Sequence, residues 1–91
     1  MSKLRVHNLK VKPQFFKDIL RGVKKFEVRR NDRNFKVNDL MVLEEYDTKN
    51  KVYTGKYINT EITYVLDDPE YCKEGYVVIA FEIRLDRGGV L

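Results

Sequence analysis

Three charged side chains lie close together in a segment that alternates between apolar and polar residues. Lys24, Glu27 and Arg29 all fall within residues 22–33, and Glu27 and Arg29 are two positions apart. On a β-strand this spacing puts both side chains on one face, about 7 Å apart, where they can pair or converge on one ligand. Arginine suits a phosphate or a base edge, lysine a phosphate, and glutamate an exocyclic amine. The segment favours a nucleotide site, and a salt-bridge ladder on an exposed strand face is the alternative.

The charge distribution along the chain is uneven. Residues 1–38 hold twelve Lys and Arg against three Asp and Glu, whereas residues 39–91 hold six against eleven. A basic segment of this kind often accompanies an anionic partner, because lysine and arginine displace counterions from phosphates. Alternatively, the basic and acidic segments pack side by side and offset one another on an ordinary solvated surface.

Five further residues are candidates for the same binding surface. His7 and Lys10 precede the segment and Arg33 follows it, while Thr54 and Lys56 flank Gly55, where a bulge would allow close backbone approach to a phosphate. His7 could stack on a base or donate a hydrogen bond, but a lone strand histidine is more often solvated or bonded to the backbone. The bend at Gly55 equally fits an ordinary change of strand direction.

The remaining composition excludes several classes of protein. One cysteine, Cys72, and one histidine provide neither an internal disulfide nor a zinc site, so we expect no metal and no other cofactor. The apolar runs are far shorter than the roughly 20 residues of a membrane span, and the positive N-terminus is not followed by an apolar segment. We therefore expect a soluble, cytoplasmic protein of one domain (residues 1–91), with its core at about 4–85 and a flexible tail at 86–91.

The hydropathy pattern predicts one early helix and five or six strands. A stripe of apolar side chains after Pro13 predicts a helix over about 13–21, with Gly22 at its C-cap. Alternation predicts a first strand over 4–9, with Leu4 and Val6 inward and His7 on the opposite face. It predicts further strands at about 24–30, 40–46, 52–66 and 76–85. Strands this long in a small chain favour an α+β fold with a curved or closed sheet, a small barrel whose helix covers one end.

The pattern Gly22-x-Lys24-x-x-Glu27-x-Arg29 resembles the signature of ASCH domains, a branch of the PUA-like β-barrels. Blocks that extend the resemblance over about residues 6–83 are His7-x-Leu9-Lys10, Phe15-Phe16-x-x-Ile19-Leu20, Asn31-Asp32-Arg33-x-Phe35, Tyr53-Thr54-Gly55 and Gly75-Tyr76. Together they are similar to a small bacterial and phage subgroup of unknown function. Asn38 departs from the family pattern because glycine usually precedes Asp39, but asparagine tolerates the left-handed conformation.

The resemblance implies a barrel with a cleft beside the early helix, lined by Lys24, Glu27 and Arg29, that binds RNA or a nucleotide-like ligand. A catalytic branch of the superfamily hydrolyses acylated cytidine with a lysine and a threonine three residues later. Here Glu27 takes the threonine position, and a carboxylate is a poorer nucleophile than an activated hydroxyl.

Three functions therefore stay open at this point. The first is an RNA- or nucleotide-binding module with no catalytic residues. The second is a small nucleoside amidohydrolase that would use Lys24 and Glu27. The third is an accessory domain that meets an acidic protein. In each case we expect a monomer or a weak homodimer and no membrane partner.

Overall fold

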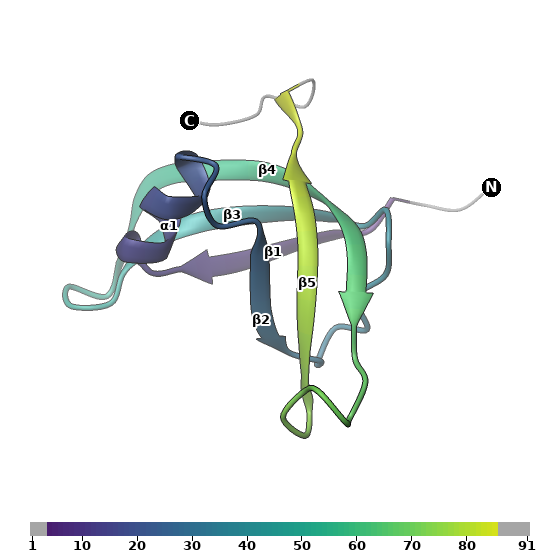
Figure 1. Ribbon diagram of the computed structural model, residues 1–91. Coiled ribbons are helices and arrows are strands. Elements are labelled where there is room, and N and C mark those ends of the chain that lie inside the picture. The colour runs from purple at the N-terminus through teal and green to yellow at the C-terminus, as the bar shows by residue number, and fades with distance from the viewer. Residues whose placement is uncertain (1–3, 86–91) are drawn as a thin grey trace.

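A computed structural model of the chain describes residues 4–85, so the tail expected at 86–91 lies outside the described residues (Figure 1). The elements in chain order are β1 (Val6–Val11), α1 (Pro13–Leu20), β2 (Phe26–Arg30), β3 (Leu40–Asp47), β4 (Val52–Leu66) and β5 (Tyr76–Ile83). The expected early helix and five of the expected five to six strands are confirmed.

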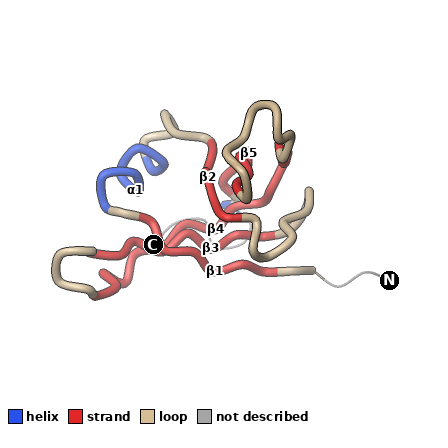
Figure 2. Tube along the Cα trace, turned by 90° about the horizontal axis from the view of Figure 1, so that it is seen from below, coloured by secondary structure: helices blue, strands red, loops and turns tan. Residues whose placement is uncertain are grey.

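The five strands form one sheet in the order β1-β3-β4-β5-β2, curved into a half-barrel (Figures 1 and 2). Strand β1 runs parallel to β3, and all other neighbours are antiparallel. The α+β, barrel-like architecture predicted from the sequence is confirmed, but the sheet is not closed by backbone pairing, because β1 and β2 are its two edges. We call the gap between these edges the seam.

Strand β4 produces the curvature because it belongs to both halves of the sheet. Residues 52–61 pair with β3 and residues 60–66 pair with β5. The register shifts twice, once across the stretch that contains Gly55 and again between Ile62 and Tyr64. Gly55 has a φ of +94°, a conformation that side chains disfavour. The bulge expected at this glycine is confirmed, and it bends the strand.

The inward face of β1 is the reverse of the expected one. Val6 is exposed, whereas His7, Leu9 and Val11 are buried. The parallel register aligns His7 with Met41 and Leu9 with Leu43 on β3, and both β3 side chains lie in the core. The prediction that Leu4 and Val6 point inward is therefore wrong, because pairing with β3 rather than hydrophobicity at the start of the strand decides the face.

Helix α1 links the two edge strands and lies at one end of the half-barrel (Figure 2). Pro13 opens the helix and Gly22, with a φ of +75°, follows its end, as expected for these residue types. Its inner side chains, Phe16 and Ile19, are buried, and Phe15 is partly exposed. Within residues 4–85 no helix is long and apolar enough to cross a membrane.

The core fills the concave side of the sheet beneath the helix. The buried apolar residues that form it are Leu9, Val11, Phe16, Ile19, Phe35, Met41, Leu43, Ile58, Ile62, Val77, Ile79 and Phe81.

Two turns follow the expected residue chemistry. Asn38 has a φ of +79°, so the asparagine does adopt the left-handed conformation. In the β3–β4 hairpin, Asp47 accepts hydrogen bonds from the Asn50 side chain and from the backbone N–H groups of Lys49 and Asn50. The bonds from Asn50, above all the side-chain bond, hold the pKa of Asp47 below its ordinary value.

A buried hydrogen bond links β1 to the turn before β3. His7 is 6% exposed, its Nε2 lies 2.9 Å from Asp39 Oδ2, and its ring packs against Phe35. Asp39 Oδ2 also accepts the backbone N–H of Lys36 at 3.0 Å. One carboxylate oxygen therefore satisfies two buried or partly buried groups.

We expect Asp39→Ala to lower the free energy of unfolding by about 2–3 kcal/mol, because it leaves the His7 ring and a backbone N–H without a partner. Urea unfolding followed by circular dichroism measures the effect. Asp39→Asn, which keeps one acceptor oxygen, should lose about half as much. Equal stability of all three proteins would contradict a structural role for this contact.

Candidate functional site

Strand β2 presents its faces in an unusual way. Glu27 is only 5% exposed, whereas the apolar neighbours Phe26 and Val28 are 46% and 55% exposed. The expected alternation is confirmed, but the charged face points inward and the apolar face outward. A buried carboxylate needs compensating charges and hydrogen bonds, which this strand and the residues before it supply.

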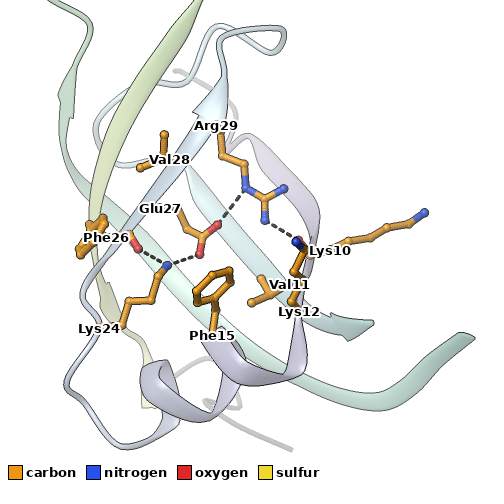
Figure 3. A pocket seen from close by; sticks show the side chains of 9 residues that line it. All are labelled: Lys10, Val11, Lys12, Phe15, Lys24, Phe26, Glu27, Val28 and Arg29. Atoms are coloured by element: carbon orange, nitrogen blue, oxygen red, sulfur yellow. Dashed lines mark hydrogen bonds and ion pairs between the residues drawn. The ribbon is translucent and has the colours of Figure 1, made fainter. Parts of the chain in front are cut away.

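Glu27 is held between two cations (Figure 3). Lys24 Nζ lies 2.8 Å from Glu27 Oε1, and Arg29 Nε lies 2.9 Å from Glu27 Oε2. Lys24 also donates to the Phe26 carbonyl at 2.6 Å. These three residues, which we call the triad, are all partly or fully buried, so their interactions are stronger than those of surface ion pairs.

Arginine side chains bridge the seam. Arg29 Nη2 donates to the Lys10 carbonyl, and Arg33 Nη1 donates to the Asn8 carbonyl at 2.8 Å. Both carbonyls belong to β1, whose other edge pairs with β3. The guanidinium groups therefore cap a strand edge that no other strand within residues 4–85 covers.

A pocket of about 400 Å³ opens at the seam above the triad. Its walls come from the end of β1, the start of α1 and the length of β2; the nine residues are Lys10, Val11, Lys12, Phe15, Lys24, Phe26, Glu27, Val28 and Arg29. We call it the seam pocket. Four of these residues are cationic and only Glu27 is anionic. The triad therefore lies in a common concavity and not on an open convex face.

Aromatic rings flank the ammonium group of the triad. Lys24 Nζ lies 5.4 Å from the centroid of the Phe15 ring and 5.0 Å from that of Phe26. Both rings are partly exposed, so each offers a flat apolar surface beside the charged groups. Within residues 4–85, no three His, Cys, Asp or Glu side chains are arranged to hold a metal ion.

Comparison with known proteins places the chain in a family. Residues 6–81 match a family described as a domain of unknown function, DUF3850. The chain belongs to the DUF3850 family. It is also similar to the "Uncharacterized 12.9 kDa protein in GpA 3'region" of Escherichia phage P2, with 32% identity over 75 residues. That match covers 82% of this chain and 66% of the phage protein, so the DUF3850 domain spans slightly less than two thirds of its relative.

The DUF3850 domain brings together only part of the residue set expected from the sequence. Lys24, Glu27 and Arg29 share the seam pocket. Lys10 lines it too, but its side chain points away (Figure 3) and its Nζ lies 4.4 Å from the centroid of the Tyr46 ring. Arg33 lies farther along the seam, in a neighbouring pocket.

The other three candidates lie elsewhere. His7 is buried against Asp39, as described above, and does not line the seam pocket. Thr54 donates to Glu45 at 2.7 Å and accepts the backbone N–H of Lys56 at 3.2 Å, which fixes the bend after the hairpin. Lys56 lines a separate pocket on another side of α1. The expected extension of the site to Thr54 and Lys56 is therefore not seen in the geometry of the seam pocket.

Sequence reasoning missed five members of the seam pocket. They are Val11, Lys12, Phe15, Phe26 and Val28, four of which are apolar side chains that a periodic pattern assigns to packing and not to a pocket. A usable signal existed for Phe15: the next residue, Phe16, is sufficient for the inner face of so short a helix, which leaves Phe15 at its edge.

Proposed function

We propose that this DUF3850 domain binds RNA or a nucleotide in the seam pocket, and that its half-barrel is a variant of the PUA-like barrel of ASCH domains. The observation that carries the proposal is the buried carboxylate of Glu27, held by Lys24 and Arg29 at a pocket flanked by two aromatic rings. Supporting the ASCH assignment are the barrel-like sheet, the early helix between its edge strands and the position of the triad on β2.

The free hydrogen-bonding capacity of the triad suits a nucleotide. Each oxygen of Glu27 accepts one hydrogen bond from the triad, which leaves a lone pair on each for an exocyclic amine. Arg29 uses Nε and one Nη2 proton, so its remaining protons can reach a phosphate or a base carbonyl. Phe15 and Phe26 provide surfaces on which a base can stack.

The pocket favours binding over hydrolysis. No Ser, Thr, Cys or His side chain stands among the described residues that line it, so a hydroxyl or thiol nucleophile is lacking there. Both Glu27 oxygens accept hydrogen bonds from Lys24 and Arg29, which hold the carboxylate in place. These features fit a module in which the triad orients a ligand.

We expect the wild-type domain to bind fluorescently labelled single-stranded RNA, and Lys24→Met and Arg29→Met each to weaken binding about 10-fold or more. A charge-assisted hydrogen bond contributes about 1.5–3 kcal/mol, and 1.4 kcal/mol corresponds to a factor of ten. Fluorescence anisotropy at several salt concentrations measures both the affinity and the salt slope, which should be about 0.7 per phosphate contact.

Arg21→Met is the matched control, because Arg21 is exposed at the end of α1 and pairs only weakly with Asp18 at 3.7 Å. It should bind like the wild type. Equal affinity of all four proteins would overturn the proposal, and so would RNA binding that does not change with salt. Acylated nucleosides are assayed in parallel: turnover abolished by Glu27→Gln would support the hydrolase instead.

A further inference from the structure

A second pocket continues the seam on the other side of Arg29. It has a volume of about 350 Å³ and shares Val28 and Arg29 with the seam pocket. Its other lining residues are Leu9, Arg30, Asp32, Arg33, Phe35 and Tyr76. We call it the distal pocket. Because both pockets are lined by Val28 and Arg29, a ligand in one lies next to a ligand in the other.

The distal pocket is strongly basic. Three arginines, Arg29, Arg30 and Arg33, line it against one acidic residue, Asp32, whose Oδ1 lies 3.9 Å from Arg33 Nε. Among the described residues, only one N–H of Arg33 donates a hydrogen bond, to the Asn8 carbonyl. The remaining donors, together with the excess positive charge, make the pocket complementary to a phosphate.

An aromatic ring forms part of the same pocket. The Arg30 guanidinium carbon lies 5.6 Å from the centroid of the Tyr76 ring, and Lys73 Nζ approaches that ring to 5.3 Å. Aromatic rings interleaved with cations are the usual means of holding single-stranded nucleic acid. The distal pocket thus repeats the combination found in the seam pocket, where Lys24 lies beside Phe15 and Phe26.

The spacing of the arginines along the seam fits a ligand with regularly spaced phosphates. Arg29 and Arg33 are anchored on the carbonyls of Lys10 and Asn8, two residues apart on β1. Two residues of a strand span about 6.6 Å. Neighbouring phosphates of an extended single strand are separated by a comparable distance, so two adjacent phosphates can each meet one guanidinium group.

We propose that the distal pocket holds the nucleotide unit adjacent to the one in the seam pocket, so that the ligand is a single strand of at least two nucleotides and not a free nucleoside or mononucleotide. This inference rests on the proposed function. The strand runs along the seam, with Arg29 between the two units, Arg33 and Arg30 on the second phosphate, and Tyr76 available for stacking.

A series of oligoadenylates of increasing length tests the proposal. Isothermal titration calorimetry with AMP, pApA and pApApApA should show that the wild-type domain binds pApA at least 10-fold more tightly than AMP. Arg30→Ala and Arg33→Ala should each lose most of this gain and keep the affinity for AMP within about twofold. Arg21→Ala, on the exposed end of α1, should retain the full gain.

The outcomes separate this inference from the proposed function. Two results would overturn only the proposal that the distal pocket holds a second nucleotide. One is equal wild-type affinity for AMP and pApA, and the other is a gain in affinity for pApA that survives in both Arg30→Ala and Arg33→Ala. Failure of the folded wild type to bind any of the three ligands overturns the proposed function and the distal pocket with it. Arg30 makes no side-chain hydrogen bond within residues 4–85, so Arg30→Ala keeps the test valid even if Arg33→Ala fails to fold.

Discussion

Replacing Glu27 with alanine is expected to lower the free energy of unfolding by about 2–4 kcal/mol. The substitution removes the one anion between Lys24 and Arg29, and leaves two partly buried cations facing each other. Breaking a buried ion pair from one side typically costs 3–5 kcal/mol, and the partial exposure of both cations reduces that figure. Urea unfolding monitored by circular dichroism measures the loss, and an unchanged midpoint would contradict the geometry of the triad.

The matched control replaces the whole triad with apolar side chains of similar size: Lys24→Met, Glu27→Leu and Arg29→Met together. Buried ion pairs exchanged for packed hydrophobic residues usually leave stability unchanged or raise it. We expect this variant to be at least as stable as the wild type and to have lost RNA binding. A triad that is present for stability alone would show the opposite, a destabilised variant with unchanged binding. Together the two variants separate the structural contribution of the triad from its proposed binding role.

The period of a strand can be predicted from the sequence, but the direction of its inward face cannot. In both β1 and β2 the alternation is correct, but each strand has apolar side chains on its outer face: Val6 in one strand, Phe26 and Val28 in the other. In β1 the inward face is set by the register against β3, and His7 is accommodated there by Asp39, 32 residues away. Such contacts depend on topology, which local periodicity does not contain.

Because local periodicity does not contain the topology, only part of the candidate site can be predicted from the sequence. Glu27 and Arg29 are two positions apart, so strand geometry alone puts them on one face, whereas Lys24 lies before β2 and pairs with Glu27 from outside the strand. Phe15 and Lys12 join the triad only because the half-barrel places the edge strands β1 and β2 opposite each other. Thr54 and Lys56 carry suitable groups, but Thr54 donates to Glu45 and Lys56 lines a separate pocket on another side of the helix.

The second large effect is expected at the helix. Phe16→Ala should lower the free energy of unfolding by about 3–5 kcal/mol, because Phe16 is only 1% exposed and the substitution leaves a cavity beneath α1. A domain of 91 residues typically has a free energy of unfolding of about 5–14 kcal/mol, so the expected loss is a large fraction of the total. Thermal unfolding followed by circular dichroism is the measurement, and a loss below about 1 kcal/mol would show that the helix is not anchored by this ring.

The neighbouring phenylalanine provides the matched control for the site. Phe15 is 42% exposed on the same helix and lines the seam pocket, where its ring lies beside Lys24. Phe15→Ala should therefore cost less than about 1.5 kcal/mol of stability, since a half-exposed ring loses only part of its burial energy. It should weaken RNA binding about 5-fold or more, because a stacked base contributes about 1–3 kcal/mol. If Phe15→Ala instead destabilised the domain as much as Phe16→Ala and left RNA affinity unchanged, the ring would be a core residue and the seam pocket would lack its stacking surface.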